Sequence, residues 1–341
     1  MRVKLAMSAG NMRENKKIVI AAPKENILRQ DVQDVVRCKN SIKGILLKQG
    51  WVIDDFWVEK KDFQLPKLIK ERILNAAPYC VFNLFEGFSD DSEKEAEFAR
   101  IMEETGVCFT GNPSYSLRIC LDKLKVNDIL RKNNINIPQG IFTDDSEKLD
   151  IEDLRFPVFI KPRFEDASVG IEEDSLVTKR ENLNKVVAKR LKNFPRGLLI
   201  EEFIPGREFN VGFLGKPPYE LAGISVMDYR SHRNLSPFLT YSSKWETSCR
   251  AFKILTPSCE EKIDDDLKGK IIDVASRTGK ILGCRGYFRV DLREKEGHLF
   301  VLDVNPNPDI NTDSGFMRQA YHKGYSYRDI VEKILKGAVS F

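Results

Sequence analysis

The stretch that decides the fold of this chain is Phe300-Val301-Leu302-Asp303-Val304-Asn305-Pro306-Asn307-Pro308, close to its end. Apolar and polar residues alternate along it. They also alternate along Gly286-Tyr287-Phe288-Arg289-Val290-Asp291, which comes shortly before. This alternation predicts two β-strands. The segment 293–298 between them is polar and contains a glycine, so the two strands are expected to form a hairpin.

The predicted hairpin gathers oxygen ligands beside one arginine. Residues two apart on a strand point to the same face, so Arg289 shares a face with Asp291, and Asp303 shares one with Asn305. If the strands pair, two carboxylates and an amide converge next to a guanidinium, which is equipment for Mg²⁺ and phosphate. Asp or Asn after one apolar run often marks only a strand end and a turn. Two such strands in succession favour a site.

Composition indicates a globular protein of two or three domains. The chain has 341 residues, of which 42% are hydrophobic and 31% charged. A net charge of +4, with bases interleaved among acids, does not indicate a nucleic-acid partner. No apolar run is long enough for a membrane span, and the first 17 residues lack the apolar core of a signal peptide. Seven scattered cysteines without a CxxC pair, and only three histidines, favour reduced thiols in the cytoplasm over a zinc site.

Strands and helices are expected to alternate in the first third of the chain. Such alternation predicts an α/β domain whose parallel sheet has helices on both faces. Gly111-Asn112-Pro113-Ser114 interrupts the pattern and is a candidate domain boundary. The expected strands are Lys17–Ala21, Trp51–Val58 and Tyr79–Leu84, and the expected helices are Asp31–Gln49, Leu65–Asn75 and Glu93–Glu104.

The remainder of the chain mixes strands and helices without internal repeats. A polar loop, Arg163–Ser168, interrupts it. The expected strands before the hairpin are Pro157–Pro162, Leu198–Ile204 and Glu208–Phe213, and the expected helices are Asp122–Asn133, Glu181–Asn193 and Asp265–Leu282.

Several charged residues stand where a nucleotide would need them. Lys161 ends a wholly apolar strand, although a lysine there is often a snorkelling side chain. Glu201 and Glu202 end another apolar strand, whose edge could offer backbone groups to an adenine. Glu208 could accept from ribose hydroxyls or be an ordinary exposed acid. Neither GxxxxGK[ST] nor a GxGxxG after a strand occurs, so lysines, a polar loop and metal would have to hold the nucleotide.

In this order, the segments resemble the ATP-grasp superfamily, and within it the D-alanine–D-alanine ligase-like enzymes. The resemblance runs from about Val81 to the C-terminus. It implies an α/β (α+β) ATP-grasp fold with a parallel N-terminal domain over residues 1–116. Central (117–203) and C-terminal (204–341) α+β subdomains would enclose the nucleotide. The segments that carry the resemblance are Tyr79–Gly87, Phe109–Asn112, Leu121–Lys123, Phe159–Pro162, Ser168–Gly170, Leu199–Phe203, Gly206–Phe209, Gly283–Asp291 and Asp303–Pro306.

The resemblance also implies roles for matching residues. ATP would be the nucleotide, with two Mg²⁺ ions expected and Mn²⁺ as a substitute. The adenine hinge would comprise Glu201, Glu202, Phe203 and Ile204, with Glu208 on the ribose. The phosphates would meet Lys123, Lys161, Lys244, Ser168 and Val169, the metal would bind Asp291, Asp303 and Asn305, and Arg289 would stabilise the transition state.

The implied reaction joins an acid to an amine. A substrate carboxylate attacks the γ-phosphate, and an amine then displaces phosphate from the acyl phosphate. A lid would have to keep water from the acyl phosphate, and the Arg163–Ser168 loop is the candidate. Amino acids or a small peptide are the expected substrates, and a homodimer is the expected assembly. Two alternatives stay open: transfer of the acyl phosphate to a non-amine acceptor, and a nucleotide-binding regulator without turnover.

Departures from the family pattern concern the substrates. Phe85-Glu86-Gly87 replaces Leu-His-Gly, and the segment after the metal asparagine reads Pro306–Asn311 instead of Thr-x-Pro-Gly. These differences argue against D-alanine in both substrate sites. Glu86 could bind an ammonium group or be a solvated acid, and Asp309 could offer a backbone N–H to the tetrahedral intermediate. Ser314 and Arg318 could receive a carboxylate, or be a helix cap and a surface charge.

Overall fold

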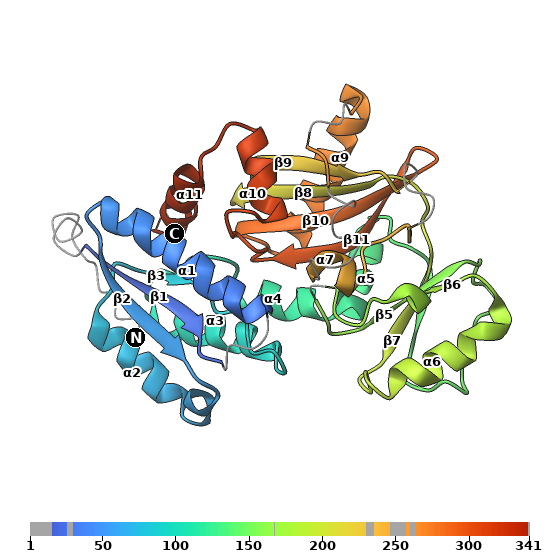
Figure 1. The fold of residues 1–341 in the computed structure, drawn as a ribbon, viewed down its shortest axis with the longest axis horizontal. Coiled ribbons are helices and arrows are strands. Elements are labelled where there is room, and N and C mark those ends of the chain that lie inside the picture. The colour runs from blue at the N-terminus through green and yellow to red at the C-terminus, as the bar shows by residue number, and fades with distance from the viewer. Residues whose placement is uncertain are drawn as a thin grey trace.

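The N-terminal domain is built on a parallel sheet. The computed structural model describes residues 16–25, 30–166, 168–229, 235–245, 257–259 and 263–339. Three strands, β1 (Lys17–Pro23), β2 (Val52–Val58) and β3 (Cys80–Asn83), lie in the order β2-β1-β3 and run parallel. Helix α1 (Gln30–Lys48) covers one face, and α2 (Pro66–Ala76) and α3 (Glu93–Thr105) cover the other (Figure 1). The predicted parallel α/β arrangement is confirmed.

Successive side chains of β1 point to opposite faces of the sheet, which explains why helices pack on both faces. Ile18 and Ile20 are buried in the core that α1 shares. Val19 and Ala21 are buried in the core formed with α2 and α3. A strand buried on both faces reads as a continuous apolar run, which is what the sequence shows here.

A second sheet forms the central part of the chain. Its strands β4 (Gly140–Thr143), β5 (Val158–Pro162), β6 (Leu176–Val177) and β7 (Leu198–Glu202) pair antiparallel in the order β4-β7-β5-β6. Helix α6 (Leu183–Leu191) packs on this sheet, and α4 (Ser114–Leu121) and α5 (Lys123–Lys132) lead into it from the N-terminal domain (Figure 1). The expectation of a strand edge at Glu201 is wrong, because Glu201 pairs with Gly140 on one side and Phe159 on the other.

The third sheet contains the predicted hairpin. Its strands β8 (Glu208–Gly215), β9 (Glu220–Met227), β10 (Gly286–Lys295) and β11 (His298–Pro306) are antiparallel, in the order β11-β10-β8-β9. Helix α9 (Asp265–Ile281) covers one face together with α5. Helices α10 (Gly315–His322) and α11 (Tyr327–Val339) pack on the other face, towards the N-terminal domain (Figure 1). At the start of the short helix α7 (Tyr241–Trp245), the N–H of Tyr241 donates to the carbonyl of Ile171 at 3.0 Å.

The alternation of side chains along β10 separates the buried core from the candidate site. Phe288 and Val290 on β10 are buried against α9. Arg289 and Asp291 therefore point to the opposite face, towards the central sheet. Within the described ranges, no helix combines the length and apolarity that crossing a membrane requires.

Candidate active site

A cavity of about 430 Å³ lies between the central and C-terminal sheets. Strands β5, β7, β8, β10 and β11 line it, together with α5, α10 and the loop after β5. Most of the residues singled out from the sequence meet there. Those in its lining are Lys123, Lys161, Ser168, Val169, Glu201, Glu202, Phe203, Ile204, Glu208, Arg289, Asp291, Asp303, Asn305 and Arg318.

The β10–β11 hairpin places the oxygen ligands as its alternation predicted. Arg289 is directly opposite Asn305, and Asp291 is opposite Asp303. Asp291 accepts hydrogen bonds from Nε and Nη2 of Arg289, at 2.7 and 2.8 Å, and from Nδ2 of Asn305 at 3.1 Å. Asn210 on β8 donates a further bond to Asp291, at 2.9 Å. Burial opposes the charge of Arg289, but Asp291 outweighs it and raises the arginine pKa.

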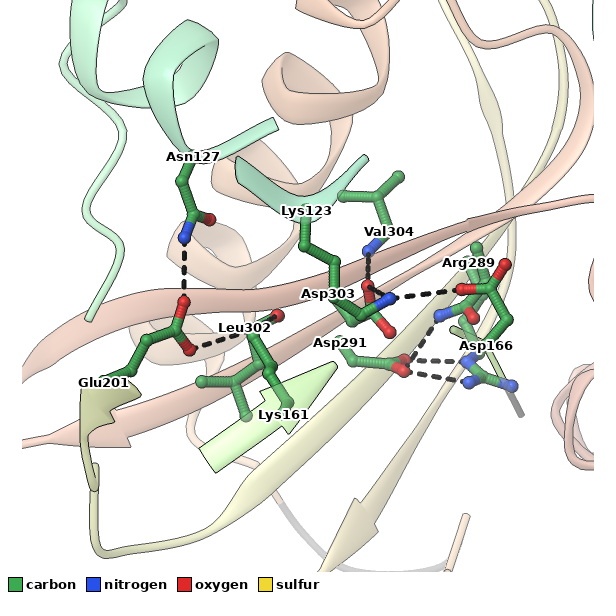
Figure 2. Close-up of polar contacts among 11 residues, drawn as sticks. Lys123, Asn127, Lys161, Asp166, Glu201, Arg289, Asp291, Leu302, Asp303 and Val304 are labelled. Carbon is green, nitrogen blue, oxygen red and sulfur yellow. Dashed lines mark hydrogen bonds and ion pairs between the residues drawn. The ribbon is translucent and has the colours of Figure 1, made fainter. Parts of the chain in front are cut away.

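Lys123 joins two carboxylates of the same site. Its Nζ lies 3.2 Å from Asp166 Oδ1 in the loop after β5 and 3.5 Å from Asp303 Oδ1 on β11 (Figure 2). Burial disfavours the charge, yet the two acids raise the pKa of Lys123 above its ordinary value. The residue before it, Asp122, caps α5 and binds Nε and Nη2 of Arg163, each at 2.7 Å. This pair fixes the start of α5 against the end of β5.

Lys161 is not a snorkelling side chain. It is buried, and its Nζ donates to the carbonyl of Leu302 on β11 at 3.0 Å. The same Nζ lies 2.8 Å from Oε2 of Glu201, and Nδ2 of Asn127 on α5 donates to Oε1 of Glu201 at 2.8 Å (Figure 2). Lys161 therefore connects the central sheet to the β10–β11 hairpin, in the lining of the cavity.

Several lining residues were not singled out from the sequence. Phe159 and Phe238 meet edge to face, with ring centroids 5.0 Å apart, and Phe203 lies 6.3 Å from Phe159. These three aromatic rings form an apolar end of the cavity that suits a planar nucleotide base. Arg293, next to Glu208, is also in the lining. The sequence signal that could have identified Arg293 as a lining residue was its position two residues beyond Asp291. Other polar residues of the lining include Asn210, Ser225, Ser243, Asp166 and Gln319.

The residues expected to bind substrate are only partly brought together. Arg318 on α10 lines the cavity, but Ser314 does not. Ser314 is the N-cap of α10, and its Oγ accepts from the N–H of Met317 at 3.2 Å. Glu86 is exposed and outside the lining. The side chain of Lys244 lies outside the described residues.

Asp309 is also exposed and outside the lining. Its Oδ1 accepts from the N–H of Asn311 at 2.8 Å and from the Asn311 amide at 3.0 Å. Its carboxylate is therefore held by the local turn.

The donor set of Asp291, Asp303 and Asn305 fits a hard cation. Magnesium usually takes one or two protein carboxylates and completes its shell with substrate phosphates and water. Two carboxylates and an amide match that need. No group of three or more His, Cys, Asp or Glu side chains suited to a metal occurs among the described residues, so phosphate and water would have to supply the other ligands.

Comparison with known proteins points to one family. The family model described as the D-ala D-ala ligase C-terminus matches residues 131–336. A D-alanine–D-alanine ligase from Carboxydothermus hydrogenoformans is 31% identical over 88% of this chain and 92% of its own length. One from Pelagibacter ubique is 30% identical over 80% and 84%. An uncharacterised protein, y4sG of Sinorhizobium fredii, is 31% identical over 75% and 73%.

Solved structures agree on the fold. A D-alanine–D-alanine ligase from Bacillus anthracis complexed with ATP superposes with a TM-score of 0.74 at 18% identity, covering 95% of this chain and 97% of that one. The VanG D-Ala:D-Ser ligase from Enterococcus faecalis gives 0.72 at 17%, covering 95% and 100%. With the family model matching well over half of its length, the chain belongs to the D-alanine–D-alanine ligase family and has the ATP-grasp fold.

Proposed function

We propose that this protein is an ATP-dependent carboxylate–amine ligase that joins amino acids or a small peptide through an acyl phosphate. One observation carries the proposal: in a member of this ligase family, a single cavity is lined by Lys123, Lys161, Arg289 and the metal-type set of Asp291, Asp303 and Asn305. The ATP complex of the Bacillus anthracis relative supports ATP as the nucleotide.

The nucleotide would lie between the aromatic end of the cavity and the hairpin. Lys123 and Lys161 would meet its phosphates. At the hinge, the N–H of Phe203 already donates to the Pro157 carbonyl at 2.9 Å, and the Ile204 carbonyl accepts from Arg293 at 2.9 Å. Among the described residues, no partner outside the strand ladder meets the carbonyl of Phe203 or the N–H of Ile204, so these are the hinge groups proposed to meet an adenine edge.

Asp291, Asp303 and Asn305 would hold Mg²⁺, with two ions expected and Mn²⁺ able to replace them. The metal would supply charge neutralisation on the phosphates. Asp291 and Asp303 are paired with Arg289 and Lys123 here. Arg289 and Lys123 are therefore close enough to stabilise the negative charge that develops during phosphoryl transfer.

In the reaction, a substrate carboxylate oxygen bonds to the γ-phosphorus as the bond to ADP breaks. The amine then attacks the acyl carbon, phosphate leaves, and the nitrogen loses a proton, so that an amide, ADP and phosphate result. The loop after β5, with Ser168 and Val169, would exclude water from the acyl phosphate. Lys244 on α7 would reach the γ-phosphate.

Arg318 is proposed to receive a carboxylate of the amine substrate. It lines the cavity on α10, and no carboxylate partner for it occurs among the described residues. Every other cation of the lining has one: Lys123 with Asp166, Lys161 with Glu201, Arg289 with Asp291 and Arg293 with Glu208. An unpaired guanidinium is a good bidentate site for a carboxylate.

The test uses hydroxylamine as the acceptor. It captures an acyl phosphate as a hydroxamate, so the amine substrate need not be known. Purified protein with Mg²⁺, ATP and a panel of amino acids and dipeptides is expected to release ADP and form a hydroxamate with at least one acid. ADP release without a hydroxamate would contradict an acyl phosphate. In the absence of hydroxylamine, a product whose mass is not that of an amide would favour a non-amine acceptor. ATP binding without ADP release from any acid would favour a regulator and refute the proposal.

Location and assembly complete the proposal. The cytoplasm supplies both ATP and free amino acids, so we place the reaction there. A homodimer is expected from the family resemblance. Light scattering coupled to gel filtration measures the mass, and a monomer at working concentration would refute the dimer.

A further inference from the structure

Arg293 contacts three segments that line the cavity at the end proposed for the nucleotide base and sugar. It is on β10, and only 3% of its surface is exposed. Its Nη1 donates to the hinge carbonyl of Ile204 at 2.9 Å, and its Nη2 donates to the carbonyl of Pro237 at 2.6 Å. Nε and Nη2 both donate to Oε2 of Glu208, at 3.2 and 3.0 Å. One guanidinium thus joins the hinge, the ribose-side acid and segment 235–239.

The carboxylate of Glu208 is bound asymmetrically. Besides Arg293, the hydroxyl of Tyr229 donates to Oε2 at 3.2 Å. No hydrogen-bond donor reaches Oε1 from the part of the chain that the structure describes, and Glu208 lines the cavity. One oxygen is therefore saturated by protein donors, and the other remains as an acceptor for a ligand hydroxyl.

Packing holds the guanidinium in this orientation. Its carbon lies 4.9 Å from the ring centroid of Phe203 and 5.0 Å from that of Tyr229. Burial, and then the nearby Glu208 charge, raise the pKa of Tyr229, which keeps its hydroxyl a donor. A lysine could not reproduce these contacts, because its donors radiate from one atom whereas the arginine fork is planar and spread.

We propose that Arg293 is a positioning residue that sets the preference of this site for ribonucleotides. It fixes Glu208 so that Oε1 meets the sugar hydroxyls, and it seats segment 235–239 over the same end of the nucleotide. The inference rests on the proposed ATP site, and it adds a residue that acts through Glu208 without touching the reacting atoms.

The experiment compares ATP, 2′-deoxy-ATP and 3′-deoxy-ATP by equilibrium titration with Mg²⁺, and by KM and kcat in the hydroxamate assay. Wild type is expected to prefer ATP to at least one deoxynucleotide by about 10- to 100-fold, the range of one charge-assisted hydrogen bond. In Arg293→Met, the ATP Kd is expected to rise and this preference to fall to about twofold. KM should rise more than kcat falls.

Two further variants sharpen the test. Arg207→Met is the matched control, since Arg207 immediately precedes β8, lies 3.8 Å from Glu294 on β10 and is outside the cavity lining. It is expected to keep wild-type affinity and preference. Tyr229→Phe removes one donor to Oε2 and keeps the ring, so a smaller loss of preference, about threefold, is expected. Tyr229→Phe also tests the inference if the Arg293→Met variant does not fold.

Several results would overturn the inference. One is a wild type that does not discriminate among the three nucleotides. Another is an Arg293→Met variant that weakens all three equally, because that indicates structural support alone. If Arg293→Met does not fold, unchanged preference in Tyr229→Phe overturns it. A wild type that binds no nucleotide would instead overturn the proposed function, so the two failures are distinguishable.

Discussion

Replacing Glu95 should change how the stability of this protein depends on pH. Glu95 is on α3 and accepts a hydrogen bond at 2.9 Å from Nδ2 of Asn307, which lies in the loop that follows β11. Oδ1 of Asn307 in turn accepts from the N–H of Asn112 at 2.8 Å, and Nδ2 of Asn112 donates to the Tyr287 carbonyl at 2.7 Å. This chain of amides ties the N-terminal domain to the β10–β11 hairpin.

The protonation of Glu95 determines the sign of the effect. Burial raises its pKa from 4.5 to about 8, the Asn307 hydrogen bond opposes this, and the Asp166 charge adds to it. The folded protein therefore keeps a proton that the unfolded chain loses. The stability penalty is absent below about pH 4.5, grows as the pH rises towards 8, and is complete above that.

The size of the penalty follows from the two pKa values. Each pH unit between them corresponds to about 1.4 kcal/mol, so full desolvation would give about 5 kcal/mol. The side chain is only partly buried, and water screening reduces this to about 1–3 kcal/mol. Glu95→Gln keeps an acceptor for Asn307 and cannot ionise. Its free energy of unfolding relative to wild type should thus improve by about 1–3 kcal/mol between about pH 5 and pH 9.

Urea unfolding followed by tryptophan fluorescence suits this test, because Trp51 and Trp57 both lie in the N-terminal domain. The control is Glu97→Gln on the same helix, where Glu97 pairs with Lys94 near the surface at 2.7 Å. Its difference from wild type should stay constant above about pH 6. A constant difference for Glu95→Gln over the whole range would refute the reasoning about burial.

Three further predictions concern the cavity. Asp303→Ala removes a proposed metal ligand and should lower kcat for ADP release by about 100-fold or more, whereas normal turnover would rule out the metal assignment. Lys161→Ala should weaken ATP binding in titration by about tenfold or more while the thermal unfolding transition persists, and unchanged affinity would count against a phosphate contact. Arg318→Gln should raise KM about tenfold for amino-acid acceptors but not for their amides, with hydroxamate formation intact. An equal rise in KM for amino acids and for their amides would show that Arg318 does not bind the substrate carboxylate.

The features predictable from the sequence are those carried by local patterns. The hairpin was foreseen because its strands are neighbours in the chain, and a period of two assigns Arg289 and Asp291 to one face. Helix α11 was missed although its signal is present: the buried residues Ile330, Val331, Ile334 and Leu335 recur at helical spacing. Strand β9 was also missed, and helix α10 was foreseen only through the alternative that Ser314 is a helix cap.

Errors arose where distant segments determine the geometry. β7 is an interior strand because β4, a four-residue strand about 55 residues earlier, pairs with its other side. Asp309 was expected near the tetrahedral intermediate by analogy with a glycine. Asn307 before it has a left-handed φ of 55° and is tied to Asn112 and Glu95, so tertiary contacts set the path of this loop.

The residues that orient the site differ in kind from those that form it. Most of the proposed metal and phosphate residues lie on strands, where alternation leaves a periodic trace, so one sequence is enough to suggest them. Arg293 is 85 positions from Glu208, and Asn112 is 195 positions from Asn307. Nothing local marks an arginine as the partner of one acid rather than another, and the choice of partner is made only when the sheets assemble. If Arg293 controls sugar preference, chains that share the metal-side hairpin can differ in the nucleotide they prefer, because the orienting contact can change while the strand pattern stays.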